Sequence, residues 1–240
     1  MSSNGRRGRV KEAAGGGAVP GLAAATPVAD STDSRLPVTC VVPAAGLSTR
    51  FGGPKLLALL DGRPLIDHSV RNAAEACVRV IVVVGGRAEP VRAAVPVADG
   101  VLIVENPNFD QGMLSSIRVG ARLVRTDRFF VAPGDMPFLD TVLFRAVWRA
   151  AEGRRNSDAW YPFRDGRRGH PVLIRSSIIP ALEETRAPSM RVFLEPYHTS
   201  RVWIDSDWPF VDLDTPADLE RYQGQRDGDG GATPGHSNGD

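Results

Sequence analysis

A loop of small residues that ends in two cations follows the first apolar run of the chain. The run Val38–Pro43 is rich in β-branched residues, as a buried strand is, and it leads directly into Ala44-Ala45-Gly46. Small residues allow backbone N–H groups to approach a phosphate chain closely. Arg50 then adds a planar guanidinium fork and Lys55 adds a compact ammonium. The loop therefore predicts a phosphate-binding turn, although it is neither a Walker A loop nor a G-x-G-x-x-G dinucleotide loop.

Two acidic positions far apart in the sequence have the chemistry of metal ligands. Asp135 follows the apolar run Phe129–Ala132, within Gly-Asp-Met-Pro, where it would hold a Mg²⁺ that bridges phosphate oxygens. The alternative is a turn aspartate that caps the next segment. Asp212 and Asp214 alternate, so they share one face of an extended segment. We interpret Asp214 as a second ligand of the same Mg²⁺, against the alternative that it merely caps the helix after it.

Directional hydrogen-bonding residues come at a third loop, between the run Val101–Val104 and a helical pattern. Asn106, Gly112, Ser115 and Ser116 suit contacts to a nucleotide base edge and a ribose. The alternative is structural, with Ser115 as a helix cap and Asn106 as a turn residue.

The histidine of Gly-His-Pro-Val follows a basic turn in the second half of the chain. A lone histidine is more often a structural donor, and the assignment of His170 to the phosphate of an acceptor substrate is what the family resemblance described below implies.

Alternating strand and helix patterns must position these residues. Strands are predicted at Val38–Pro43, Val78–Val84, Val101–Val104 and Phe129–Ala132, with helices at Pro64–Ala76, Leu114–Arg125 and Thr141–Ala151. This βαβα order predicts an α/β fold, in which helices cover both faces of a mostly parallel sheet. Ligands of such sheets bind at the carboxyl ends of the strands, so the three loops described above should gather at one edge. Further strands are expected at Asp158–Phe163, Pro171–Ile174 and Arg201–Ile204, with helices at Ser176–Glu184, at Ser189–Glu195 and after Thr215.

The composition bounds the number of domains and the class of partner. Residues 1–36 and 223–240 are rich in Gly, Ser and other small or polar residues, so we expect disordered extensions around one domain at 37–222. The net charge of +1 favours neither nucleic acid nor a membrane surface as partner, and no apolar run is long enough to span a bilayer. Cys40 and Cys77 lie in apolar runs and are expected as free thiols, which suits the cytoplasm.

The first loop resembles the signature of the nucleotidyltransferases of the molybdenum-cofactor type, A-A-G-x-S-x-R-(F/M)-G-x-P-K-L-L. The matching residues are Ala44, Ala45, Gly46, Ser48, Arg50, Phe51, Gly52, Pro54, Lys55, Leu56 and Leu57. The Gly-Asp-Met-Pro and Gly-His-Pro-Val stretches and the loop pattern from Asn106 to Gly120 also match this family.

This resemblance implies a Rossmann-like three-layer sandwich of the nucleotide-diphospho-sugar transferase type, and a Mg²⁺-dependent enzyme. Arg50, Lys55 and Asp135 would be catalytic, and Asp135 and Asp214 would hold the metal. The Pro-Ala-Ala-Gly form of the loop is similar to that of the cytidylyltransferases of the family, which implies CTP, a molybdopterin acceptor and release of pyrophosphate. An apo molybdenum hydroxylase is then a candidate partner.

Three alternatives remain open on the sequence. The cytidylyltransferase of the methylerythritol phosphate pathway shares Val-Pro-Ala-Ala-Gly, but it has Asp-Ala-Ala-Arg-Pro in place of Gly134–Pro137. Transfer to a sugar phosphate is a second option. The third is a non-catalytic nucleotide-binding accessory factor for molybdenum hydroxylases, which would bind nucleotide and release no pyrophosphate.

Overall fold

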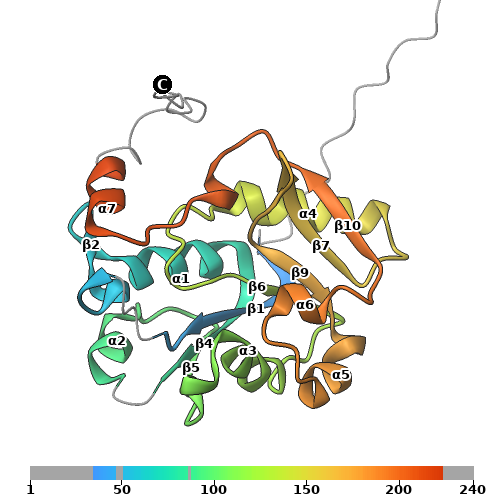
Figure 1. Cartoon of the computed structure of the whole chain (residues 1–240), viewed down its shortest axis with the longest axis horizontal. Helices are drawn as coiled ribbons and strands as arrows, with labels where there is room; N and C mark the ends of the chain where they lie inside the picture. Colours follow the sequence, from blue (N-terminus) through green and yellow to red (C-terminus); the bar gives the residue numbers. More distant parts are fainter. Residues whose placement is uncertain (1–34, 47–50, 86–87, 224–240) are drawn as a thin grey trace, which may run out of the picture. The chain divides into compact units, whose positions relative to one another are not determined.

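The computed structural model describes residues 35–46, 51–85 and 88–223 of the 240-residue chain. Arg50, and nearly all of the two extensions for which disorder is predicted, lie outside the described residues. An eight-stranded sheet forms the centre of the described part, with helices on both of its faces (Figure 1). The arrangement confirms the predicted α/β fold with a mostly parallel central sheet.

The strand order is β10-β7-β9-β6-β1-β4-β5, and β8 pairs with β7. The strands are β1 (Leu36–Ala44), β4 (Cys77–Val84), β5 (Val101–Glu105), β6 (Arg128–Val131), β7 (Ala159–Arg164), β8 (Arg167–Arg168), β9 (Val172–Arg175) and β10 (Thr199–Trp203). β1 pairs in parallel with β4 and β6, and β4 pairs in parallel with β5. β9 runs antiparallel to both β6 and β7, and β10 is parallel to β7.

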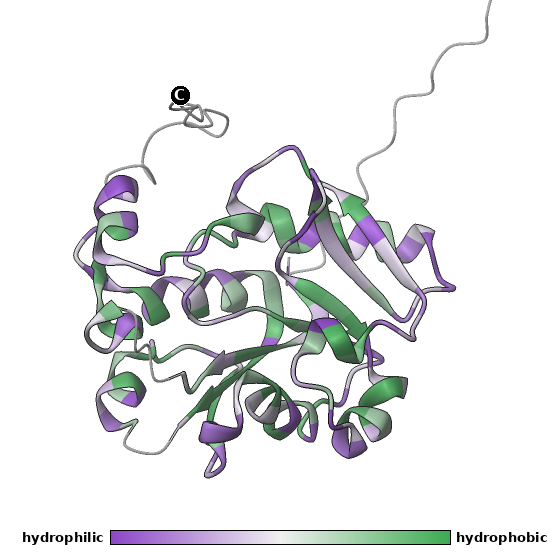
Figure 2. Cartoon of the chain, in the orientation of Figure 1, coloured by the Kyte–Doolittle hydropathy of each residue, from purple (hydrophilic) through white to green (hydrophobic). Residues whose placement is uncertain are grey.

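The helices divide between the two faces according to their apolar residues. They are α1 (Leu65–Ala76), α2 (Glu89–Ala94), α3 (Met113–Ala121), α4 (Thr141–Gly153), α5 (Ile179–Glu184), α6 (Met190–Phe193) and α7 (Pro216–Tyr222). α1, α2 and α4 pack on the face that includes Cys40 and Val42, while α3, α5 and α6 pack on the face that includes Val41. Figure 2 shows the apolar residues concentrated in the sheet and on the helix surfaces toward it.

β1 is the strand on which this division depends. From Val38 to Ala44 every residue is buried, and successive side chains enter opposite cores, as expected of a central strand covered on both faces. Cys40 and Cys77 are buried free thiols, as predicted, and burial raises the pKa of the Cys77 thiol well above its ordinary value.

Several short elements differ from the sequence-based expectations. α2 has no buried residue, so its sequence carries little helical periodicity. The small hairpin β2 (Leu59–Leu60) and β3 (Arg63–Pro64) was also missed, although Asp61 and Gly62 have the positive φ values of a tight turn. Ordered structure extends one residue beyond the predicted domain of 37–222 at each end, and the domain limits themselves stay a prediction. Leu36 begins β1, and the Gln223 side chain hydrogen-bonds the backbone of residues 59 and 61.

No helix in the described part of the chain combines the length and the apolar character that crossing a bilayer requires.

Gly120 allows α3 to approach the sheet, and its replacement provides a test of this packing. A Cβ at Gly120 would lie 2.4 Å from Val41 Cγ1 and 3.1 Å from Val83 Cγ2. Gly120→Ala should lower the free energy of unfolding by about 1–3 kcal/mol, as overpacking of a filled core does. Urea denaturation measures this change. Gly153→Ala is the matched control, because no surrounding atom lies within 4 Å of its Cβ position. An equal loss of stability in both variants would contradict the close approach.

Candidate active site

Lys55 lies between two carboxylates that come from distant parts of the chain. Its Nζ is 2.8 Å from Asp135 Oδ2 and 2.9 Å from Asp214 Oδ1. The side chain of Lys55 is 8% exposed, whereas those of Asp135 and Asp214 are 32% and 51% exposed. A nearly buried ammonium requires paired charges, so these contacts fix where the three segments meet. The structure thus brings together three of the residues to which the sequence analysis assigns catalysis and metal binding.

The electrostatics of the cluster keep the ammonium charged. Burial by itself lowers the pKa of Lys55, but the negative charge of Asp135 and hydrogen bonds to Asp135 and Asp214 outweigh burial and raise the pKa above its ordinary 10.5. Lys55 is therefore a fixed positive charge throughout the physiological pH range.

Close backbone packing positions Asp135 at the carboxyl end of β6. The Gly134 N–H donates to the Pro43 carbonyl at 3.1 Å, which ties the loop to the end of β1. A Cβ on Gly134 would lie 2.8 Å from Ile66 Cδ1, so a larger residue here would displace the loop. On the other side, Asn72 Nδ2 donates to the Pro137 carbonyl at 2.8 Å.

The sequence analysis missed Asn72 as a positioning residue. It lies on α1 and is 6% exposed, among the apolar residues of that helix. A polar residue on the buried face of an amphipathic helix was the available signal, because a buried amide needs a hydrogen-bond partner.

Asp214 is positioned by the extended segment before α7 and by the cap of that helix. Val211 and Leu213 are buried while Asp212 and Asp214 are exposed, so the two acids share one face, as their spacing predicts. The side chains of Thr215 and Asp218 form a reciprocal capping box at the start of α7. Since these two residues satisfy the helix N-terminus, the carboxylate of Asp214 remains directed at Lys55.

His170 lies beside the same cluster. Its ring Nδ1 is 3.5 Å from the Val131 carbonyl at the end of β6, and its backbone N–H donates to the Pro209 carbonyl at 3.0 Å. Burial lowers the pKa of the imidazole below its ordinary 6.5, against the raising effects of the Val131 carbonyl and the charges of Asp135 and Asp212. The ring is therefore neutral at pH 7.

Asp212 belongs to the same electrostatic environment, although the sequence analysis favoured Asp214 over it. Although Asp212 is exposed as a residue, partial desolvation of its carboxyl, followed by the negative charges of Asp214 and Asp135, raises the pKa of that group. The edge of the sheet at β1 and β6 thus carries three carboxylates, one ammonium and one neutral imidazole.

The loop after β5 is held by a buried network of side chains. Asn106 Nδ2 donates to the hydroxyls of Ser115 at 2.8 Å and Ser116 at 3.0 Å, and Asn106 Oδ1 accepts from the Asn108 N–H at 3.0 Å. Asn106 and Ser116 are each 1% exposed. In this arrangement the three side chains hold the loop and the start of α3 rather than facing solvent, which favours the structural alternative for them.

The small-residue loop after β1 lies next to the loops that follow β4 and β5. Ala44 ends β1 and is buried, Ala45 is half-buried and Gly46 is exposed. A Cβ on Gly85, just after β4, would lie 3.2 Å from the Ala45 carbonyl oxygen and 2.9 Å from the Phe109 ring. Gly112 has φ of 89° at the start of α3, a conformation that glycine adopts without strain. These loops therefore converge at the carboxyl ends of the parallel strands, as the topology predicts.

Comparison with protein families gives one match, to the MobA-like NTP transferase domain, over residues 40–202. The chain is 32% identical over 190 residues to the molybdenum cofactor cytidylyltransferase of Escherichia coli K12, covering 77% of this chain and 97% of that protein. It is 31% identical over 201 residues to the nicotine blue oxidoreductase of Paenarthrobacter nicotinovorans, covering 79% and 98% of the two chains.

Among solved structures, the fold is similar to that of Rv0371c from Mycobacterium tuberculosis H37Rv in complex with manganese. The TM-score is 0.61 at 23% identity, and the match covers 78% of this chain and 97% of that one. At this level of identity the likeness shows a shared fold.

The buried network of Asn106 predicts a clear effect on stability. Asn106→Ala would remove the hydrogen bonds to the Ser115 and Ser116 hydroxyls and to the Asn108 N–H, at a cost of about 1–3 kcal/mol in the free energy of unfolding. Denaturant titration measures this loss. Asn108→Ala is the control, since its exposed side chain caps no helix and should change stability by less than about 0.5 kcal/mol. Unchanged stability of Asn106→Ala together with weakened nucleotide binding would instead show that Asn106 contacts the nucleotide directly.

Proposed function

This chain belongs to the MobA-like NTP transferase family, and from that premise we propose that it is a Mg²⁺-dependent cytidylyltransferase. It would move CMP from CTP onto the phosphate of a molybdopterin-type cofactor. The observation that carries the proposal is the convergence of Lys55, Asp135 and Asp214 at the carboxyl ends of the parallel strands. The identity to a molybdenum cofactor cytidylyltransferase over most of both chains supports the choice of CTP and acceptor.

In the proposed reaction an oxygen of the acceptor phosphate attacks the α-phosphorus of CTP. A new P–O bond forms, the bond between the α-phosphorus and the bridging oxygen breaks, and that oxygen leaves with pyrophosphate. Negative charge therefore moves toward the leaving group, and the ammonium of Lys55 is positioned to stabilise it. The backbone of Ala44, Ala45 and Gly46 would hold the triphosphate, and we assign Arg50, from the same loop, to the same charge-stabilising role.

The residues at the cluster fit a divalent metal. Oxygens of Asp135 and Asp214 converge on one point, at 2.8 and 2.9 Å from the Lys55 nitrogen, and carboxylate oxygens are the ligands that Mg²⁺ prefers. In the described part of the chain no set of three or more His, Cys, Asp or Glu residues forms a metal site. Two carboxylates with further positions for water and phosphate match the usual surroundings of Mg²⁺ at nucleotide sites. When bound, the metal would offset the charge of the phosphate oxygens.

His170 and its neighbours suit the acceptor side of the site. We propose that the neutral imidazole hydrogen-bonds the acceptor phosphate, because it lies beside the Asp135 loop and carries no charge that would pair with the acids. The product would serve an apo molybdenum hydroxylase, and the reaction would take place in the cytoplasm, in keeping with two buried free thiols.

An oxidoreductase is the competing function, because a relative of that name is nearly as similar to this chain. Acids and an amine at one point suit phosphate and metal chemistry, whereas the two thiols belong to the core and not to this cluster. Incubation with a reduced nicotinamide and dye substrates separates the functions. Oxidation of the nicotinamide without any pyrophosphate release would favour the oxidoreductase.

Removal of either partner of the central ion pair should abolish efficient transfer. Lys55→Ala and Asp135→Asn should each lower kcat by about 10²–10³-fold, the usual effect of one preorganised electrostatic group. The assay is pyrophosphate release from CTP, GTP, ATP and UTP in the presence of molybdopterin. Asp205→Asn is the matched control, because Asp205 is exposed and has no ion pair in the described part of the chain. Full transfer by Lys55→Ala would refute the proposed role, and preference for GTP would refute CTP.

The cluster also predicts competition between Lys55 and the metal. Without nucleotide, the ammonium occupies the point between Asp135 and Asp214 at which Mg²⁺ would bind. Lys55→Met removes this charge. Mn²⁺, used as a probe, should therefore bind the variant at least about tenfold more tightly than the wild type, although we expect the variant to be inactive. Electron paramagnetic resonance of free Mn²⁺ measures the affinity. Asp214→Asn should weaken Mn²⁺ binding, and equal affinity of wild type and Lys55→Met would show that metal and ammonium do not share a site.

A further inference from the structure

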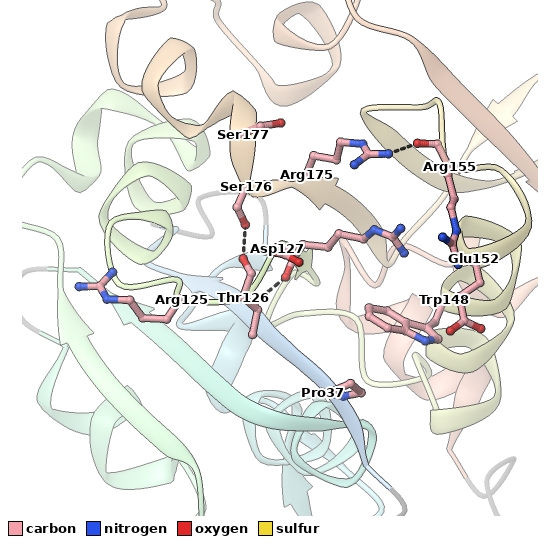
Figure 3. Close-up of a pocket in the computed structure, with 11 residues that line it drawn as sticks. Pro37, Arg125, Thr126, Asp127, Trp148, Glu152, Arg155, Arg175, Ser176 and Ser177 are labelled. Atoms are coloured by element: carbon pink, nitrogen blue, oxygen red, sulfur yellow. Dashed lines mark hydrogen bonds between the residues drawn. The ribbon is translucent and has the colours of Figure 1, made fainter.

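A second group of charged side chains surrounds a cavity at the opposite edge of the sheet. The cavity has a volume of about 880 Å³, and it opens beside the first residues of β1 and β6 and the last residue of β9. Its charged lining consists of Arg125, Asp127, Arg128, Glu152, Arg155 and Arg175. Figure 3 shows Arg175 next to Arg155, the side chain of Arg155 extending toward Glu152 and Trp148, and Arg125 on the far side, directed away from them.

This cavity is distinct from the candidate active site. Arg128 is the first residue of β6, and Asp135 comes after the end of that strand. At about 3.3 Å per residue of extended chain, the two positions are on the order of 20 Å apart. A ligand in the cavity would therefore not touch Lys55, Asp135 or Asp214.

We call Arg128, Arg155 and Arg175 the arginine cluster. The guanidinium of Arg128 lies 5.5 Å from the centre of the Trp148 ring and 5.2 Å from that of Trp160. In the part of the chain that the structure describes, no carboxylate forms an ion pair with Arg128 and no acceptor forms a hydrogen bond with it. Burial, followed by the like charges of Arg175 and Arg155, lowers the pKa of Arg128, and the charges of Glu152 and Asp127 do not outweigh these effects. The arginine cluster therefore carries more positive charge than the neighbouring carboxylates of Glu152 and Asp127 neutralise.

Two members of the cluster, Arg128 and Arg175, are also held in place. Arg175 lies 5.7 Å from the centre of the Trp160 ring, its Nε donates to the Ser157 carbonyl at 2.7 Å, and its Nη2 donates to the Arg155 carbonyl. Two guanidinium planes therefore stack on one buried indole. The indole N–H of Trp160 is itself buried and has no hydrogen-bond partner among the described residues. Fixed cations lose little conformational entropy when an anion binds, which is the condition for a preorganised site.

From this geometry we propose that the cavity binds an oligophosphate group through the guanidinium groups of the arginine cluster. Planar guanidinium forks match the oxygens of phosphate, and several of them at one cavity favour an anion with more than one charge. The volume of about 880 Å³ exceeds what a single phosphate needs and accommodates a chain of linked phosphates, free or carried by a nucleotide. The bound anion would remove the repulsion among the three arginines.

Calorimetric titration of the full chain with inorganic tripolyphosphate, without divalent metal, tests the proposal. The experiment is done with the Lys55→Ala protein, in which phosphate binding at the candidate active site is weakened. One binding event is expected, and Arg128→Gln combined with Arg155→Gln should weaken it at least tenfold. Because Arg128 packs on two tryptophans, Arg155→Gln alone, at an exposed position, provides a second variant that keeps this packing. It should weaken binding about threefold or more, as loss of one charged hydrogen-bonding group does.

Arg149→Gln is the matched control, since it removes the same charge from an exposed position of α4 that does not line the cavity. Equal affinity for ATP and tripolyphosphate would identify the free phosphate chain as sufficient, and tighter binding of ATP would identify a nucleotide as the ligand. Absence of binding to Lys55→Ala, or equal weakening by Arg149→Gln and Arg155→Gln, would overturn the proposal. Binding that both cluster variants leave unchanged would overturn it as well.

Discussion

The ammonium of Lys55 between Asp135 and Asp214 is the interaction on which the geometry of the site depends. Asp135 and Asp214 lie 80 and 159 positions after Lys55 in the sequence. Two carboxylates this close repel each other, and a nearly buried ammonium is costly alone, so each charge is tolerable only in the presence of the others. The loop after β1, the loop after β6 and the start of α7 must therefore adopt mutually compatible positions.

The glycines around the cluster show how the backbone permits this convergence. A Cβ added at Gly134 would lie 2.8 Å from Cδ1 of Ile66. A Cβ added at Gly169 would lie 2.6 Å from the Pro209 carbonyl oxygen. The first allows the Asp135 loop to lie against α1, and the second allows the chain before His170 to pass the segment that leads to Asp214. A side chain at Gly169 would collide with backbone, whereas one at Gly134 would mainly require the end of the Ile66 side chain to move. Close packing and the ion pairs of Lys55 therefore act together to hold the three segments.

The sequence predicted the parts of this arrangement that follow from strong periodicity and parallel topology. The strands around Val41 and Val82 are apolar on both faces, and the carboxyl ends of parallel strands must share an edge, so the proximity of Lys55 and Asp135 followed from the order of elements. α2 escaped prediction because it buries no residue. The interpretation of Asn106 depended on its hydrogen-bond partners, and those are set by tertiary packing that local pattern does not encode. The position of Asn72 on the buried face of α1 could be inferred from the helical pattern, but its partner, the Pro137 carbonyl, could not.

Net charge conceals how the charges of this protein are distributed. The chain carries +1 overall, which by itself indicates no large basic surface. Yet one edge of the sheet gathers three acids around Lys55, while the other gathers three arginines, two of which lie over Trp148 and Trp160. Opposite charges at opposite edges cancel in the sum but not in space, because about 20 Å exceeds the screening length of roughly 8 Å at physiological ionic strength. Each edge therefore presents its own field to a ligand, and two sites with different chemistry can coexist on one small sheet.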